Sequence, residues 1–366
     1  MQLIHGLHFR NIRGDIYGGL VAAVVALPLA LAFGVASGAG AIAGLYGAIF
    51  VGFFAALFGG TPAQASGPTG PMTVVMAGIL ITFAHEPALA FTAVILGGVL
   101  QIIFGIIGLG RYITFVPYPV ISGFMSGIGG IIMILQVGPL LGHAAKTGVV
   151  ANLKTIPEFL QTFSPEATFI GFLTLGIVYL TPKKIGQIVP PPLLALVIGT
   201  LTTYFFLPSV PLIGEVPKGF PTHIIPMMHV NSLLIMLESA LVLALLGTID
   251  SLLTSLVHDN MTRTQHDSDR ELIGQGIGNA FAGFFGGLPG AGATMRTVAN
   301  IRTGGRTPIS GALMAMVLLG TLLGLGSQGI VGFYFELCVS DVDPCLPFSP
   351  HRQLRPRHWI HRGPTD

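Results

Sequence analysis

Asp250 is a carboxylate in the middle of a long apolar stretch, residues 233–257. Placing a charge among apolar residues is costly, so an acidic side chain there usually lines a polar cavity. Thr254 follows four residues later and therefore lies on the same face of a helix. One carboxylate, hydroxyls and free backbone carbonyls form an oxygen cage that suits a sodium ion. The alternative is that Asp250 caps a helix end or is hydrogen-bonded within the core.

Two short apolar segments begin after a break in the pattern, one at Thr69-Gly70 and the other at Ala293-Thr294. A helix N-terminus presents free N–H groups and a partial positive charge of roughly half a unit. Two such ends that face each other would bind a small anion, and the two threonine hydroxyls would add hydrogen bonds. The other interpretation is that glycine and proline here only permit close helix packing.

Arg296 lies inside the second short segment, two residues after Thr294. Its guanidinium would add a full positive charge near the proposed anion site. Three roles remain open at this point: a clamp on an oxyanion, an ion pair with Asp250, or an extended side chain that reaches the membrane surface beside Arg302 and Arg306.

The composition excludes several classes of protein. Hydrophobic residues make up 52% of the chain and charged residues 9%, whereas a soluble domain carries about 25% charged residues. The net charge of +2 gives no basic surface for a nucleic acid. No nucleophile, phosphate-loop or dinucleotide motif indicates an enzyme. The chain is therefore expected to be a membrane protein and not an enzyme, with no cofactor besides a coupling ion.

Residues 258–271 are rich in histidine and aspartate. They lack the ligand spacing of a zinc site, so we interpret them as a solvated cytoplasmic turn. Asp267, Ser268 or Asp269 is expected to cap the helix that follows.

Long apolar runs predict about eleven membrane segments. They lie near residues 16–35, 41–60, 68–84, 89–109, 116–141, 167–181, 190–207, 231–257, 271–287, 293–303 and 308–335. If the N-terminus is cytoplasmic, the inside loops hold nine Lys and Arg residues and the outside loops three, as the positive-inside rule requires. The inside set is Arg10, Arg13, Arg111, Lys183, Lys184, Arg263, Arg270, Arg302 and Arg306, and the outside set is Lys146, Lys154 and Lys218.

A nonapeptide occurs twice, as FAALFGGTP at 54–62 and FAGFFGGLP at 281–289. The copies end the second and ninth segments, so an odd number of spans separates them and they run in opposite directions. Interrupted segments at matching places in two inverted halves indicate a transporter. The offset from Phe54 to Phe281 places the end of a complete second half at roughly residue 450, so we expect the second repeat to be incomplete.

Eight passages make the chain resemble the SulP family of inorganic anion transporters over roughly residues 8–328, and in particular its members that transport bicarbonate with sodium. The passages are NIRGD at 11–15, ALP at 26–28, AFGVASGA at 32–39, PTGPMTVVM at 68–76, VISGFMSG at 120–127, IDSLLTS at 249–255, ELIGQG at 271–276 and GAGATM at 290–295.

The resemblance implies an all-α polytopic fold of seven plus seven inverted segments, with a core and a gate bundle, in a bacterial plasma membrane. It also implies a homodimer in the full-length form and alternating access. It implies substrate binding at Thr69, Gly70, Ala293 and Thr294, and sodium binding at Asp250, Thr254, Gly292 and Thr294.

Two features depart from the family pattern. Arg296 stands where the bicarbonate-transporting members have a small residue, which leaves bicarbonate, sulfate and chloride open as substrates. The apolar pattern also fails near Cys338. We expect a transporter domain at 1–335, a polar tail at 336–366 that is disordered or frame-shifted, and no STAS domain.

Three functions follow from these patterns. The first is sodium-coupled bicarbonate uptake. The second is a sulfate permease, coupled to protons, with Arg296 as the clamp on a divalent anion. The third is a non-transporting fragment of a disrupted transporter.

Overall fold

The computed structural model describes residues 4–115, 118–143, 149–186, 191–207, 224, 226–227 and 232–323. The predicted tail at 336–366, Lys146 and Lys218 lie outside these ranges, as do the side chains of Lys183 and Lys184. Within the described residues, all eleven predicted segments correspond to helices; residues 324–335 of the last predicted segment lie outside these ranges. Proline at the first turn begins several of them, where its missing N–H leaves no helical hydrogen bond unmade.

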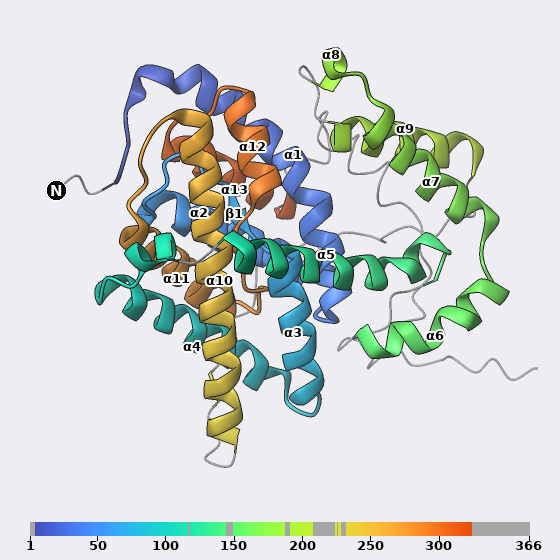
Figure 1. Ribbon diagram of the computed structural model, residues 1–366, viewed down its shortest axis with the longest axis horizontal. Helices are drawn as coiled ribbons and strands as arrows, with labels where there is room; N and C mark the ends of the chain where they lie inside the picture. The colour runs from blue at the N-terminus through green and yellow to red at the C-terminus, as the bar shows by residue number, and fades with distance from the viewer. Residues whose placement is uncertain are drawn as a thin grey trace, which may run out of the picture.

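Eight helices form one bundle, which we call the core (Figure 1). Four come from the first half: α1 (Ile12–Ser37), α2 (Ala41–Phe58), α3 (Gly70–Thr82) and α4 (Pro87–Ile106). Four come from the second half: α10 (Leu233–Thr262), α11 (Ser268–Phe284), α12 (Thr294–Arg302) and α13 (Pro308–Leu322). Short 3₁₀ turns precede α1 and follow α4, namely η1 (Phe9–Asn11) and η2 (Gly110–Phe115).

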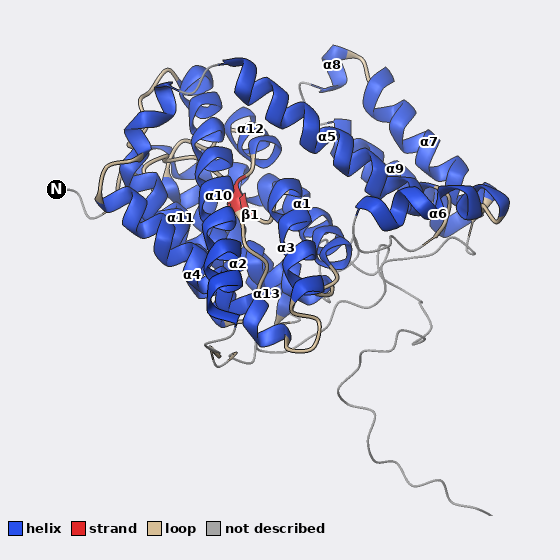
Figure 2. Cartoon of the chain, turned by 60° about the horizontal axis from the view of Figure 1, so that its bottom comes forward, coloured by secondary structure: helices blue, strands red, loops and turns tan. Residues whose placement is uncertain are grey.

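The remaining helices form a second group, the gate, which lies to the right of the core in Figure 2. It contains α5 (Tyr118–Leu140), α6 (Val149–Gln161), α7 (Pro165–Leu180), α8 (Lys183–Gly186) and α9 (Pro191–Phe206). Two of these helices were not predicted, the short α8 and α6, and α6 forms an angle of 115° with α7. Polar residues interrupt its apolar face, so no long apolar run marked it as a segment.

The helix contacts repeat between the two halves in the order that an inverted repeat requires. Helix α4 packs on α11 as α13 packs on α2, and α10 packs on α4 as α1 packs on α13. Helix α1 also contacts α12, and α10 contacts α3. Each of these contacts between a helix of one half and a helix of the other thus has an equivalent with the two halves exchanged. This pattern is the predicted inverted repeat.

Two short strands, β1 (Ser66–Gly67) and β2 (Ala291–Gly292), cross in the middle of the core as an antiparallel pair. Ser66 pairs with Gly292 and Gly67 with Ala291. The pair satisfies backbone groups where α3 and α12 have not yet begun, as broken backbone at this depth requires. Neither strand was predicted, because two residues are too few to show an alternating pattern.

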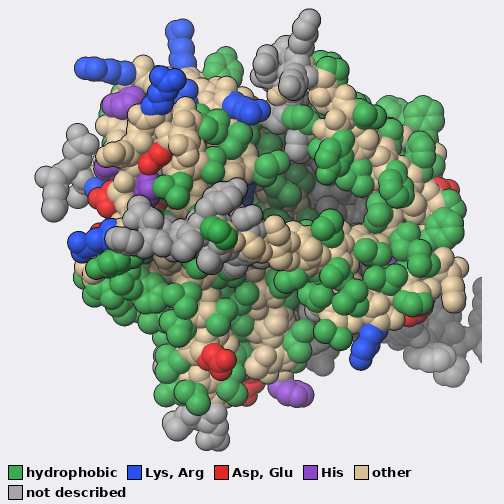
Figure 3. Space-filling view, viewed as in Figure 1, with side chains coloured by type: hydrophobic (Ala, Val, Ile, Leu, Met, Phe, Trp, Pro, Cys, Tyr) green, Lys and Arg blue, Asp and Glu red, His purple; other side chains and the backbone are tan. Residues whose placement is uncertain are grey.

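Hydrophobic side chains cover much of the face of the molecule shown in Figure 3. Large side chains such as Tyr179 and Phe206 are 83% and 76% exposed. Among the described residues, four helices are long and apolar enough to cross a membrane, or five if the bent pair α6–α7 counts as one span. These surfaces suit a lipid environment.

One end of the core carries most of its arginines, and we call it the arginine-rich end. Three contacts bring its segments together: Asn11 Nδ2 donates to Gly304 O, Arg111 N to Asp269 Oδ1, and Asp267 N to Gly60 O. In Figure 3 the Lys and Arg side chains gather mainly along the upper left edge. The arginines of these segments are Arg10, Arg13, Arg111, Arg263, Arg270, Arg302 and Arg306.

Candidate functional site

One turn of α10 connects the starts of both short helices. Thr69 Oγ1 donates to Asp250 Oδ2 over 2.7 Å. One turn further along, Thr254 Oγ1 lies 2.8 Å from Thr294 Oγ1 and donates to Gly292 O at 2.9 Å. The predicted site residues from both halves therefore meet in the middle of the core, as the sequence indicated.

The N-termini of α3 and α12 have no side-chain caps. The N-cap of α3 is Thr69, whose hydroxyl is directed to Asp250, and the N-cap of α12 is Ala293, which has no polar side chain. By contrast, Asp267 and Thr307 cap α11 and α13 by accepting hydrogen bonds from backbone N–H groups. The first-turn N–H groups of the two short helices are thus not bound by an N-cap side chain, and groups of this kind can bind an anion.

Arg296 is buried, at 2% exposure, and does not extend to the membrane surface. Its Nη2 donates to Pro68 O, immediately before α3, over 2.7 Å. Its Nη1 is buried with no hydrogen-bond partner in the described part of the chain. The snorkelling role is therefore wrong, and a direct hydrogen bond to Asp250 is not what holds the side chain. Arg296 places a positive charge beside the start of α3.

Two glycines let other groups approach the site closely. A Cβ at Gly292 would lie 2.2 Å from Gln64 Nε2 and 3.1 Å from Thr254 Cβ. A Cβ at Gly70 would lie 2.4 Å from Ile132 Cδ1, which belongs to α5. The start of α3 therefore faces the gate, so a ligand at this place would lie between the two bundles.

The donor atoms fit sodium better than zinc. Asp250 supplies a carboxylate, Thr254 and Thr294 supply hydroxyls, and Gly292 supplies a carbonyl. These are hard oxygen ligands of the kind that alkali and alkaline-earth cations prefer. Within the described residues, no group of three or more His, Cys, Asp or Glu side chains forms a candidate metal cluster.

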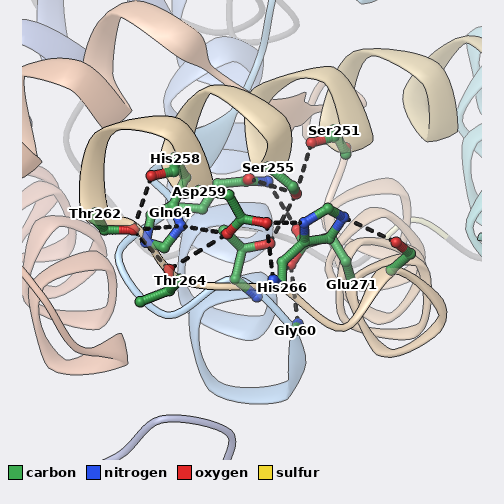
Figure 4. A network of polar contacts seen from close by, with 12 residues as sticks. Gly60, Gln64, Ser251, Ser255, His258, Asp259, Thr262, Thr264, His266 and Glu271 are labelled. Atoms are coloured by element: carbon green, nitrogen blue, oxygen red, sulfur yellow. Dashed lines mark hydrogen bonds and ion pairs between the residues drawn. The ribbon is translucent and has the colours of Figure 1, made fainter. Parts of the chain in front are cut away.

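A second polar network supports the site from the arginine-rich side (Figure 4). Glu271 Oε2 accepts from the backbone N–H groups of Gly60 and Thr61, both at 3.0 Å. Its Oε1 accepts from Gln64 Nε2 and Gln275 Nε2, both at 2.8 Å. Four donors thus hold one carboxylate and connect α11 to the end of the first nonapeptide.

This network and its link to the site were not predicted from the sequence. Ser251 Oγ accepts from Gly292 N, and Ser255 Oγ lies 2.8 Å from Thr61 Oγ1. The signal was present: Ser251 and Ser255 follow Asp250 and Thr254 by one residue each, so α10 has a second polar ridge with the same four-residue spacing.

The interpretation of residues 258–271 as a solvated turn was wrong for its histidines. His258 is 1% exposed, and His266 Nδ1 lies 2.7 Å from Asp259 Oδ2. The helix α10 continues to Thr262, which draws His258 and Asp259 into the bundle. Among the three candidate caps, Asp267 is the N-cap of α11 and accepts from Arg270 N.

The chain is similar in sequence to known transporters. The bicarbonate transporter BicA of Picosynechococcus sp. is 53% identical over 94% of this chain and 64% of its own length. The putative sulfate transporter YvdB of Bacillus subtilis is 37% identical over 73% of this chain and 52% of its own length. The chain therefore spans less than two thirds of these relatives.

The fold also matches a solved structure. The transmembrane domain of a cyanobacterial bicarbonate transporter BicA superposes with a TM-score of 0.82 at 49% identity, covering 92% of this chain and 90% of that one. Residues 12–329 match the sulfate permease family. By its sequence and its fold, the chain belongs to the sulfate permease family.

Proposed function

We propose that the protein carries bicarbonate across the membrane together with sodium by alternating access. The observation that carries this proposal is the single turn of α10 that connects two uncapped helix N-termini through Asp250–Thr69 and Thr254–Thr294. Two partial positive charges and the guanidinium of Arg296 face the same place, which suits a small anion. The relatives named as bicarbonate transporters support the choice of substrate.

Sodium would bind on the α10 side of the site. Asp250 would provide the charge, and Thr254, Thr294 and Gly292 would provide neutral oxygens. A bound cation cancels the negative charge of Asp250 and so favours the anion at the helix starts. By linkage, the anion strengthens the binding of sodium by the same factor.

Alternating access would come from movement of the core against the gate. Among the described residues, the helix contacts that join the two groups are mainly those of α3 with α5 and of α1 with α9. An interface of limited extent permits one bundle to slide against the other while the site stays intact within the core. We place the N-terminus and the arginine-rich end on the cytoplasmic side, following the positive-inside rule.

Uptake of labelled bicarbonate into cells that express the chain, with and without external sodium, tests this function. We expect sodium to be required and Asp250→Asn to abolish the sodium-dependent part. Glu238, exposed on the same helix, gives the matched control Glu238→Gln, which should keep uptake. Uptake of equal rate without sodium would disprove the coupling.

The second candidate, sulfate transport, is favoured by Arg296. Its buried Nη1 has no partner among the described residues, so it could donate to a second anionic oxygen. The relative YvdB is named as a putative sulfate transporter. Competition separates the two functions: if sulfate abolishes bicarbonate uptake at equal concentration and is itself transported, sulfate permease is the better description.

A further inference from the structure

A cavity lies at the arginine-rich end of the core, away from the site of Asp250. Its volume is about 310 Å³. His258 follows Asp250 by eight residues, which places it roughly 12 Å further along α10. The cavity is lined by His8, Asn11, Pro62, His258, Thr262, Thr264 and Arg306.

The side chain of His258 has one ring nitrogen without a partner. Its Nδ1 lies 3.3 Å from Asp259 Oδ1, and a carboxylate oxygen only accepts, so Nδ1 carries the hydrogen in that contact. Its Nε2 is buried and has no hydrogen-bond partner among the described residues. In the neutral ring this nitrogen is therefore an acceptor that lacks a donor. A buried polar atom of this kind calls for a ligand or water.

The rest of the lining offers donors and a positive charge. Arg306 Nη1 donates to the carbonyls of Ile301 and Gly305, both at 3.1 Å, which fixes the guanidinium. The guanidinium also carries N–H groups on Nη2 and Nε, which can donate to an anion. Two carboxylates lie beside the lining, and both are engaged. Asp15 accepts from Arg306 N at 2.8 Å and from Thr307, and the two oxygens of Asp259 are engaged by His258, Thr264 and His266 (Figure 4). The lining itself holds an arginine and no acidic residue, which favours an anion over a metal cation.

We propose that this cavity binds a small oxyanion that carries a hydrogen, of the class of bicarbonate or hydrogen phosphate. The anion's O–H would donate to His258 Nε2, and its charged oxygens would accept from the Arg306 guanidinium. Sulfate and chloride have no hydrogen to donate at neutral pH, so they would leave the histidine nitrogen unpaired. The site is separate from the one at Asp250 and goes beyond the proposed transport function.

Direct binding of inorganic phosphate, bicarbonate and sulfate to the purified full chain, measured by titration calorimetry, tests the proposal. The Thr69→Val variant serves to disable the site at Asp250. In that background we expect phosphate and bicarbonate to bind and sulfate to bind at least tenfold more weakly. One hydrogen bond that involves a charged group changes the binding affinity by roughly 10- to 100-fold.

Two substitutions with matched controls locate the site. Arg306→Gln and His258→Leu should each weaken the binding of phosphate by roughly tenfold or more. Arg302→Gln, at an exposed arginine outside the lining, and His85→Gln, at an exposed histidine after α3, should not. Arg306 is exposed, so its variant tests the site even if His258→Leu does not fold.

Three results would overturn the proposal: equal binding of sulfate and phosphate, unchanged phosphate binding in Arg306→Gln, or no oxyanion binding in the Thr69→Val background. None of these depends on bicarbonate uptake. Failure of this site is therefore distinguishable from failure of the transport function.

Discussion

Phe54 and Phe281, which occupy the same position in the two nonapeptides, stack on each other with ring centroids 4.2 Å apart and an angle of 17° between the planes. Residues related by a two-fold axis touch only if the axis passes close to them. The pseudo-symmetry axis of the inverted repeat therefore runs beside this pair. The antiparallel pair β1–β2 lies at the same axis, since its two strands come from matching places in the two halves.

This arrangement explains why the repeated nonapeptide lies next to the site in the sequence although its own residues do not line the site. The phenylalanines pack the ends of α2 and α11 together. The breaks that follow each nonapeptide then bring β1 and β2, and with them the starts of α3 and α12, to the axis. A site on such an axis receives equivalent backbone from both halves, and the side chains of α10 make it asymmetric.

Gly67→Ala is expected to disrupt the site through Arg296. Gly67 has φ of 148°, in a region that favours glycine, and an added Cβ would lie 2.7 Å from Arg296 Nη1 and 3.1 Å from Ala48 Cα. The backbone strain costs about 1–3 kcal/mol. We expect a lower midpoint of thermal unfolding and loss of anion uptake.

The matched control is Gly78→Ala in α3, where an added Cβ meets no atom within 4 Å. Alanine is preferred over glycine inside a helix by roughly 0.5–1 kcal/mol. This variant should unfold at the same or a higher temperature and keep uptake. Equal effects of the two substitutions would show that Gly67 does not act through Arg296.

Thr254→Val is expected to weaken sodium activation of uptake. The substitution keeps the shape of the side chain but removes the hydroxyl that contacts Thr294 and Gly292. We expect the sodium concentration for half-maximal uptake to rise by roughly tenfold, which corresponds to a loss of about 1.4 kcal/mol in sodium binding. Thr248→Val on the same helix is the control, because the hydroxyl of Thr248 is buried with no partner in the described structure. An unchanged sodium dependence in Thr254→Val would remove Thr254 from the sodium site.

Glu271→Gln is expected to destabilise the protein. The carboxylate accepts from four N–H donors, and two of these belong to the backbone of Gly60 and Thr61 and cannot turn away. A glutamine turns one acceptor into a donor that faces donors. Each hydrogen bond to a charged group corresponds to about 1.5–3 kcal/mol, so thermal unfolding should occur at a clearly lower temperature. The exposed Glu238→Gln should leave the unfolding temperature unchanged, and equal stability of both variants would contradict the role given to Glu271.

The helices that consist of long apolar runs could be predicted from the sequence. The features that depend on tertiary contacts could not. The apolar runs located all eleven segments, and Asp250, Thr254 and the two helix starts were identified because their polarity is unusual in an apolar context. The burial of His258 and the four donors on Glu271 were not predictable in this way, because charged residues near the end of a span look the same whether they face solvent or another helix. The three roles of Arg296 were left open for the same reason, since side-chain direction depends on Gly67 and Pro68 from the other half.

Arg296→Gln is expected to change the choice of anion more than the stability. Glutamine is neutral and shorter than arginine. The substitution therefore removes the positive charge beside the start of α3 and the hydrogen bond to Pro68 O. If the buried Nη1 donates to the anion, inhibition of bicarbonate uptake by sulfate should weaken by roughly tenfold or more, because a divalent anion gains most from a nearby positive charge. The control Arg302→Gln changes an exposed arginine at the other end of α12 and should leave sulfate inhibition unchanged. If Arg296→Gln lowers the unfolding temperature but keeps the same ratio of sulfate to bicarbonate affinity, the arginine only fastens α12 to Pro68, and the two helix starts select the anion without it.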